Sequence, residues 1–409
     1  MTATATQTAA PKLWFAVVVV LIDALGLGII IPILPGLLKE LTGRGVNETA
    51  FIGGAMMAVY ALNQFVFGPI MGALSDKFGR RPLILFCLGT LVVDYMLMAL
   101  SWSVWVLFVG RFVAGLAGAS HSVATAYVTD ISERDKRSAN IGLIGAAFGV
   151  GFILGPVLGG LASLIDLRAP LWIAAALCAI GVVFAYVAVP ESLPQDRRRS
   201  FSLAASNPFS ALWRLARIPA LGALLVVAFL NALGGFVYPA IWAYWGTEVF
   251  GWGGPMIALS LACYGIGVAL VQGGLIRVII PMIGEPRTIW LGLSIAVAGL
   301  FLFSLANTQW MVFAIIPIAC LSHMADAALI GVMSKQVPDT EQGELQGVIG
   351  SLSAITAIVT PLWATAVFFV AADREAGFYF PGAPYILAAV ITLLALIPLA
   401  RGLRNARLS

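Results

Sequence analysis

Charged residues are scarce in this chain of 409 residues, because only 10% are Asp, Glu, Lys or Arg while 61% are hydrophobic. A soluble globular domain carries about a quarter charged residues, so this composition excludes an ordinary soluble protein. The hydrocarbon of a bilayer offers no hydrogen-bond partners to the backbone, and a helix pairs its own N–H and C=O groups. The composition therefore predicts an all-α integral membrane protein that lies in a lipid bilayer.

Residues that carry enzymatic or metal chemistry are equally sparse. The chain has two histidines and four cysteines, and Cys87, Cys178, Cys263 and Cys320 all lie in apolar runs without metal-ligand or disulfide spacing. We predict that the cysteines are packing residues. We also find no phosphate loop, no nucleophile with a matching base and no metal-ligand cluster, so we expect no catalytic residues, no metal and no cofactor.

Long apolar runs dominate the rest of the chain. A membrane helix needs about 20 apolar residues. Breaks at charges and turn residues predict twelve transmembrane helices at roughly 13–38, 51–73, 82–101, 104–128, 139–163, 170–189, 220–246, 255–280, 287–306, 310–334, 347–371 and 380–400.

The basic residues are distributed unevenly between the predicted loops. If the N-terminus is cytoplasmic, eighteen of the 23 Lys and Arg residues fall in inside segments, four fall in outside loops, and Arg111 lies within a span. This asymmetry indicates that both termini are cytoplasmic. Because the basic residues sit in short loops, the net charge of +4 does not indicate a nucleic-acid partner.

The longest polar stretch divides the chain near its midpoint. Residues 191–219 are predicted to be a cytoplasmic linker between an N-terminal six-helix bundle, 1–190, and a C-terminal six-helix bundle, 220–409. A weak internal echo, "GRRPLIL" from Gly79 and "GEPRTIW" from Gly284, follows span 2 and span 8. Such an arrangement is typical of two pseudo-symmetric repeats.

The loop between spans 2 and 3 reads "GALSDKFGRRP". Charged residues in such a short loop set the orientation of the protein in the membrane, or the acid forms an ion pair that stabilises one conformation. The loop resembles the signature of the major facilitator superfamily, with Lys77 where an arginine is common; the matching residues are Gly72, Leu74, Asp76, Gly79, Arg80 and Arg81.

Span 5 carries a stripe of small residues in "GVGFILGPVLGG". Glycines at this spacing allow close helix packing, and the pattern also resembles the drug/proton antiporters of the superfamily; its residues are Gly151, Gly155, Pro156, Gly159 and Gly160. With Asp23, Asp94 and Arg111 in spans 1, 3 and 4, the chain resembles the tetracycline/proton antiporters.

The resemblance implies a twelve-helix major facilitator fold in a bacterial inner membrane and proton-coupled efflux of amphiphilic drugs by alternating access. We expect a small-molecule drug and protons as partners and a monomer as the assembly. The alternatives are a proton-coupled transporter of an endogenous metabolite and a membrane receptor or channel that does not transport.

Six ionisable residues fall within the predicted spans, where an unpaired charge costs several kcal/mol or more. Asp326 follows His323 by three residues, which puts both on one helix face. We predict that residues among these six couple transport to protons, and the alternative is that they form structural pairs. For Arg111 the candidate partners are Asp23 and Asp94. The six residues are Asp23, Asp94, Arg111, His121, His323 and Asp326.

The chain departs from the tetracycline antiporters at two positions of the C-terminal half. They usually carry an acid where this chain has Ala296 and a histidine near Val268. Under the superfamily fold, Asp23, His121, His323 and Asp326 converge on a central cavity, and we predict that His323 and Asp326 replace the missing groups or that the substrate differs.

Polar and aromatic residues of spans 2, 7 and 8 are candidates for substrate binding. We expect Trp245 to be an interfacial anchor, since tryptophan prefers the headgroup level. The substrate-binding candidates are Gln64, Asn231, Tyr238, Trp242 and Gln272.

Overall fold

The computed structural model describes residues 9–118, 120–198, 215, 218–338, 341–375 and 377–406. Among these residues the secondary structure is helical and contains no strand. Twelve helical spans within them are long and apolar enough to cross a membrane, which confirms the predicted all-α membrane fold. Most of the predicted linker 191–219 lies outside the described residues.

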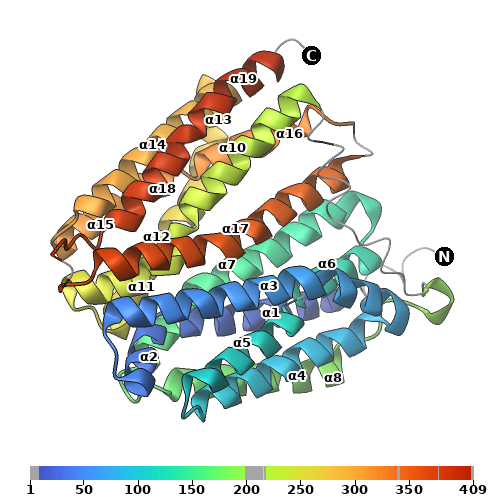
Figure 1. The fold of residues 1–409 in the computed structure, drawn as a ribbon. Helices are drawn as coiled ribbons and strands as arrows, with labels where there is room; N and C mark the ends of the chain where they lie inside the picture. Colours follow the sequence, from blue (N-terminus) through green and yellow to red (C-terminus); the bar gives the residue numbers. More distant parts are fainter. Residues whose placement is uncertain are drawn as a thin grey trace. The chain divides into compact units, whose positions relative to one another are not determined.

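The helices follow one another along the chain as Figure 1 labels them. They are α1 (Ala9–Ile30), α2 (Leu34–Thr42), α3 (Val46–Phe78), α4 (Arg80–Ala99), α5 (Val104–Ala117), α6 (Ser120–Ile131), α7 (Arg137–Ala162), α8 (Ala169–Ala188), α10 (Pro219–Gly235), α11 (Val237–Phe250), α12 (Gly254–Leu270), α13 (Ile276–Ile283), α14 (Glu285–Leu305), α15 (Gln309–Leu321), α16 (Met324–Ser334), α17 (Gln342–Ala371), α18 (Ala383–Leu394) and α19 (Leu396–Ala406).

Several predicted spans are interrupted rather than continuous. The predicted span 13–38 is wrong in its extent, because α1 ends at Ile30, a turn containing Pro32 follows, and α2 begins at Leu34 with Pro35 as its second residue. Proline has no N–H to continue the backbone ladder, which explains the break. Spans 4, 7, 10 and 12 each consist of two helices, α5 with α6, α10 with α11, α15 with α16 and α18 with α19. A π-helical segment, Val271–Leu275, separates α12 from α13.

The chain divides into two compact units. Unit 1 contains 1–43, 59–206 and 253–262, and unit 2 contains 44–58, 207–252 and 263–409. The boundaries predicted from the sequence, 190 and 219, stay a prediction. We describe each unit separately below.

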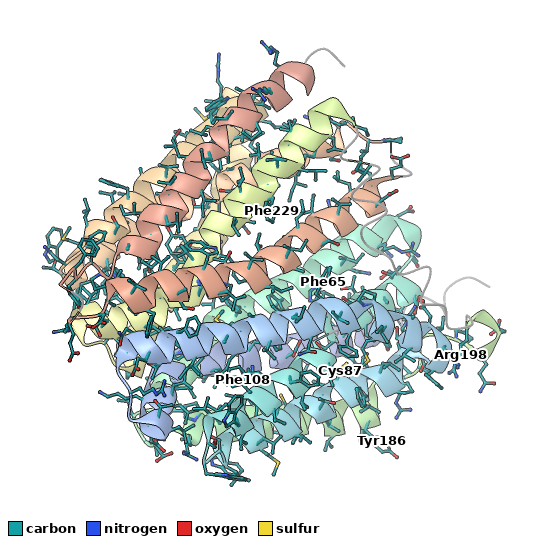
Figure 2. All side chains as sticks on the ribbon, in the orientation of Figure 1. Phe65, Cys87, Phe108, Tyr186, Arg198 and Phe229 are labelled. Carbon is teal, nitrogen blue, oxygen red and sulfur yellow. The ribbon has the colours of Figure 1, made fainter. Side chains whose placement is uncertain are left out.

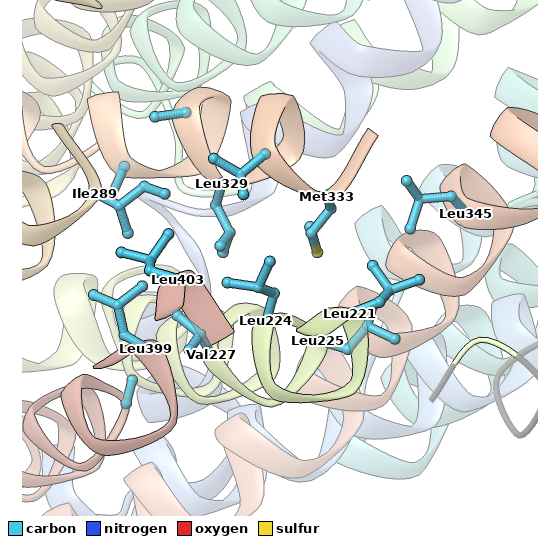
Figure 3. Close-up of a cluster of buried hydrophobic side chains, with 14 of the residues drawn as sticks. Leu221, Leu224, Leu225, Val227, Ile289, Leu329, Met333, Leu345, Leu399 and Leu403 are labelled. Carbon is cyan, nitrogen blue, oxygen red and sulfur yellow. The ribbon is translucent and has the colours of Figure 1, made fainter. Parts of the chain in front are cut away.

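Each unit has its own hydrophobic core. In unit 1, Val20 of α1 packs with Ile84 of α4 and Val123 of α6. In unit 2, Figure 3 shows leucines of α10, α16 and α19 meeting, among them Leu224, Leu329 and Leu399. These cores fix the helices that carry the polar side chains described next.

The four cysteines behave as the sequence predicts. All of them are free thiols; Cys87 (Figure 2), Cys178 and Cys320 are buried, and Cys263 is half-buried. A buried thiol packs as a small apolar side chain.

Candidate functional site

A cavity of about 370 Å³ lies within unit 2, at the point where two spans are interrupted. Phe236, which joins α10 to α11, and His323, which joins α15 to α16, both line it. Discontinuous membrane helices commonly form binding sites at their breaks. The polar lining residues are Asn231, Tyr238, Tyr264, Ser322, His323, Asp326, Ser353, Thr356 and Thr392.

The two breaks have local causes in the sequence. Pro239 has no N–H to donate to the carbonyl of Gly235, so α11 begins as a new helix after Phe236. In span 10 the Ser322 hydroxyl donates a hydrogen bond to the Ala319 carbonyl at 2.6 Å. Such a bond competes with the helical ladder, and α16 starts two residues later with His323 as its N-cap.

A hydrogen-bonded chain of four side chains runs along the cavity wall. The Asn231 amide donates to Asp326 Oδ1 at 2.8 Å. His323 Nδ1 lies 3.1 Å from Asp326 Oδ2, and His323 Nε2 lies 2.9 Å from the Tyr264 hydroxyl. His323 and Asp326 therefore contact each other, as their spacing predicts, while their role stays a prediction.

The four hydrogen-bonded side chains can keep their contacts whether the His323 ring is neutral or protonated. A neutral imidazole donates through one nitrogen and accepts through the other, and an imidazolium donates through both. The Tyr264 hydroxyl can donate to or accept from His323 Nε2, and the Asp326 carboxylate accepts from Nδ1. The Asp326 side chain is 42% exposed, so ligands and protons can reach it.

Tyr264 is a site residue that the sequence did not reveal. It lies in an apolar run of α12, 59 residues before His323, and nothing in its neighbourhood along the chain marks it as a polar partner of that ring. Ala296, the position of the missing acid, lines the same cavity as Asp326, whereas Val268 is not among the described lining residues.

Tyr238 lines the cavity and continues into an aromatic cluster of α11, α14 and α18. Trp242 packs behind it with a ring-centroid distance of 6.1 Å and is only 2% exposed, so its ring is not on the described cavity wall. The prediction of Trp245 as an interfacial anchor is wrong, because it is 1% exposed and packs edge-on against Tyr385 and Phe250.

The two glutamines lie away from this cavity lining. In unit 1, Gln64 donates to the carbonyl of Gly118 at 2.8 Å, where span 4 is interrupted. In unit 2, Gln272 is an exposed residue of the π-helical segment. Their proposed role in substrate binding stays a prediction.

Unit 1 contains a second group of buried charges. Arg111 forms an ion pair with Asp94, which is fully buried, and its guanidinium lies 5.7 Å from the centre of the Tyr60 ring. Asp23 instead accepts a hydrogen bond from Ser120. Of the two candidate partners, Asp94 is therefore the one that pairs with Arg111.

His121 lies at the start of α6 in the same unit. Its ring meets the Phe148 ring edge-on with a centroid distance of 5.5 Å, and its Nδ1 atom is buried without a described hydrogen-bond partner. The predicted convergence of Asp23, His121, His323 and Asp326 involves both units and stays a prediction.

The loop after α3 holds a network of ion pairs within unit 1. Arg80 lies 2.6 Å from Asp76 and 3.0 Å from Asp130, which ties the ends of α3, α4 and α6 together. Gly79 has φ of 105°, a conformation that a side chain would strain. Gly72, by contrast, has open space where a Cβ would lie.

Glu191 caps the helix that begins after Gly79. Its carboxylate accepts hydrogen bonds from the backbone N–H of Arg80 at 2.8 Å and of Arg81 at 3.3 Å, and Arg81 also donates to the Tyr186 carbonyl. A helix N-terminus favours an anion because its first N–H groups lack helical partners. The network explains why an acid follows Pro190 here.

The small-residue stripe of α7 faces the backbone of α1. A Cβ on Gly155 would lie 2.6 Å from the Leu25 carbonyl oxygen, and one on Gly151 would lie 2.8 Å from the Leu21 carbonyl oxygen. Gly159 faces Ile29 in the same way, Pro156 contacts Gly28, and Gly160 faces the carbonyl of Gly254. The stripe therefore acts as a close packing surface.

Among the described residues, no group of three or more His, Cys, Asp or Glu side chains is placed to hold a metal ion. The hydrogen-bonded side chains of the cavity wall offer proton exchange and hydrogen bonding to a ligand.

Comparison with known proteins identifies the fold and the family. Residues 16–361 match the Major Facilitator Superfamily. The chain is 37% identical to the class C tetracycline resistance protein of Escherichia coli, over 94% of this chain and 95% of that protein. It is 34% identical to the class G tetracycline resistance protein of Vibrio anguillarum, over 94% of this chain and 96% of that protein.

Solved structures have the same fold at low identity. The human organic anion transporter MFSD10 matches with a TM-score of 0.70 at 23% identity, covering 96% of this chain and 99% of that one. The nucleoside transporter NupG matches with a TM-score of 0.73 at 14% identity, covering 95% of this chain and 98% of that one. The chain belongs to the major facilitator superfamily, and it is therefore a multi-pass membrane transporter rather than an enzyme.

Proposed function

We propose that this protein exports amphiphilic drugs, tetracycline-like or more varied, in exchange for protons and by alternating access. We place it in a bacterial inner membrane with both termini cytoplasmic. The tetracycline resistance proteins among its relatives support drug export, and the excess of basic residues in the predicted inside loops supports the orientation.

The observation that carries this proposal is the contact of Asp326 with His323 and Asn231 at the break between α15 and α16. A carboxylate is costly inside a membrane protein unless it is paired or hydrated. Protonation removes this cost, so a drug and a proton that compete for the same carboxylate are coupled. Ala296 on the same cavity wall supports the view that the acid has moved to Asp326.

Two features of unit 1 support conformational change as the transport mechanism. The ion pairs of Arg80 with Asp76 and Asp130 join three helix ends and can stabilise one state. The Gly155 contact with α1 lets two helices pack closely enough to move as one body. Buried polar side chains of the same unit, Asp23 and Asp94, are further candidates for proton coupling.

The test is transport by proteoliposomes with an acidic lumen. We expect the wild type to accumulate tetracycline or another amphiphilic drug, and we expect Asp326→Asn to lose this proton-driven accumulation because the side chain no longer ionises. Counterflow of a drug without net charge should persist in the Asn variant, since the cavity walls remain. Asp326→Glu should retain part of the coupling.

Glu48→Gln is the matched control, because it makes the same chemical change at a surface position where Glu48 forms a 3.9 Å pair with Arg44. It should accumulate drug like the wild type. Undiminished proton-driven accumulation by Asp326→Asn would refute the assignment and shift coupling to Asp23 or Asp94. Accumulation of a metabolite but of none of the drugs would favour the alternative substrate class.

A further inference from the structure

The last span of unit 2 carries a stripe of outward-facing residues. In α18 and α19 exposed side chains follow one another at intervals of three or four residues, which is the spacing of one helix face. The stripe is apolar along most of its length and basic at its end; it consists of Leu387, Val390, Leu394, Ile397, Arg401 and Arg404. A long apolar face suits an acyl chain, and arginine stems extend such a face while their charged ends reach the headgroup level.

The neighbouring span, α14, carries a second stripe with the same spacing. It consists of Arg287, Leu291, Ser294, Ala298, Phe301 and Leu305, all of them exposed. The Trp290 ring next to its basic end is 38% exposed. Because tryptophan prefers the headgroup level of a bilayer, this end of the stripe fits a position at the membrane surface.

The two spans run in opposite directions beside each other. Figure 1 shows α14 next to α18, and α14 contacts both α18 and α19. Gly382, just before α18, lies against the carbonyl of Ser304 near the end of α14. The start of α14 therefore meets α19, and the two stripes have their arginines at the same end of unit 2.

Buried side chains join the two helices at this basic end. Figure 3 shows Ile289 of α14 beside Leu399 and Leu403 of α19, and all three belong to one buried cluster. Arg287 precedes Ile289 by two residues, and the two arginines of α19 flank Leu403 along the chain. The three exposed guanidinium groups thus surround one helix contact.

No ion pair within the described part of the chain involves these three arginines. Glu285, the acid next to Arg287 in α14, is paired with Lys335 at 2.6 Å. The arginines of α19 complement the dipole at the end of their helix, but Arg287 lies in the first turn of α14, where the dipole favours an anion. The helix dipoles therefore do not account for the whole cluster, and an anion from outside the chain would balance it.

We propose that this face of unit 2 binds an anionic phospholipid, with its phosphate on Arg287, Arg401 and Arg404 and its acyl chains along the two stripes. Guanidinium groups bind phosphate oxygens through paired hydrogen bonds, and basic residues between membrane helices bind anionic headgroups. A zwitterionic lipid brings the same phosphate and chains, but its ammonium group adds a positive charge beside the arginines. The proposed orientation places this lipid in the cytoplasmic leaflet.

The test compares two lipids with identical chains, dioleoyl phosphatidylglycerol and dioleoyl phosphatidylcholine. Purified full-length protein is freed of lipid in detergent and titrated with each, and native mass spectrometry counts the bound molecules. We expect phosphatidylglycerol to bind about tenfold or more tighter, because each arginine at a membrane surface contributes about fivefold. This comparison uses the wild type alone, so it stands even if a variant fails to fold. Equal binding of the two lipids would overturn the proposal.

The soluble headgroup separates a lipid site from a site for free phosphate compounds. Glycerophosphoglycerol has the phosphate and the charge of phosphatidylglycerol but no acyl chains. At equal concentration it should leave the bound lipid in place, because it cannot contact the apolar stripes. Displacement of the lipid by this compound would overturn the assignment to a phospholipid.

Variants then locate the charges that make the selection. Arg287→Gln, and Arg401→Gln combined with Arg404→Gln, should lower the preference about fivefold for each arginine removed. Arg44→Gln makes the same change at an exposed ion pair elsewhere in unit 2 and should leave the preference unchanged. Arg277→Gln removes an exposed arginine of α13 that belongs to neither stripe, and an equal loss there would overturn the site in favour of a diffuse field. Folding of each variant is checked by its size-exclusion profile and melting temperature.

This inference and the proposed function can fail separately, because the binding test needs neither a drug nor a proton gradient. A preference for phosphatidylglycerol in a protein that exports no drug would support the inference and defeat the proposed function. Equal binding of the two lipids by a protein that exports drug would do the reverse.

Discussion

Gly155→Leu is expected to abolish transport and to reduce the yield of folded protein sharply. A Cβ at this position would lie 2.6 Å from the Leu25 carbonyl oxygen and 2.8 Å from the Cα atom of Gly28. Both atoms belong to the backbone of α1, which cannot move aside as a flexible side chain can. Overpacking of this kind costs about 1–3 kcal/mol or more, and here it also separates α1, with Asp23, from α7.

Gly149→Leu on the same helix is the matched control. Gly149 is exposed, and a Cβ there would meet no atom within 4 Å. The same substitution should therefore leave folded yield and transport close to wild type, both measured after purification by size exclusion and in proteoliposomes. Wild-type behaviour of Gly155→Leu would show that the stripe is a loose surface and that its pattern has no role in packing.

Arg111→Ala is expected to cause the second large loss. The substitution leaves the fully buried Asp94 without its ion pair, and removing one partner of a buried pair costs about 3–5 kcal/mol. We expect a lower melting temperature and a lower yield of folded protein. Arg44→Ala, which breaks an exposed pair with Glu48, should change stability by about 0.5 kcal/mol or less.

A double variant separates the loss of the pair from the loss of side-chain volume. Replacing Asp94 with Leu and Arg111 with Met removes both charges and keeps an apolar filling, which often costs little stability. The double variant should therefore regain most of the melting temperature that Arg111→Ala loses. If Arg111→Ala is as stable as wild type, the pair does not stabilise unit 1. Transport by a stable double variant then tells whether the pair also serves coupling.

The number and approximate positions of the twelve spans could be predicted because hydropathy and loop charge depend on residue type alone. The breaks within the spans could not, because one missing or diverted backbone hydrogen bond leaves the apolar pattern unchanged. Pro239 sits well inside a span, yet it ends the ladder at Gly235 and opens the cavity beside Phe236. Pro32 and Pro35 were visible in the sequence and mark the break that the predicted span 13–38 missed.

Local spacing predicted part of the candidate site. His323 and Asp326 are three residues apart, so their contact follows from the chain itself. Asn231 is 95 residues from Asp326 and Tyr264 is 59 residues from His323, and only tertiary packing brings these partners from other helices together. For Trp245 the residue type suggested the membrane interface, but neighbouring aromatic rings offered a better-packed position inside unit 2.

If drug and proton compete for the Asp326–His323 pair, binding of the drug releases protons. Purified protein in weakly buffered detergent is mixed with a saturating amphiphilic drug, and a pH indicator reports the protons that are released. We expect release from the wild type and from Glu48→Gln, and none from Asp326→Asn. Drug binding without proton release by the wild type, or equal release by Asp326→Asn, would contradict it.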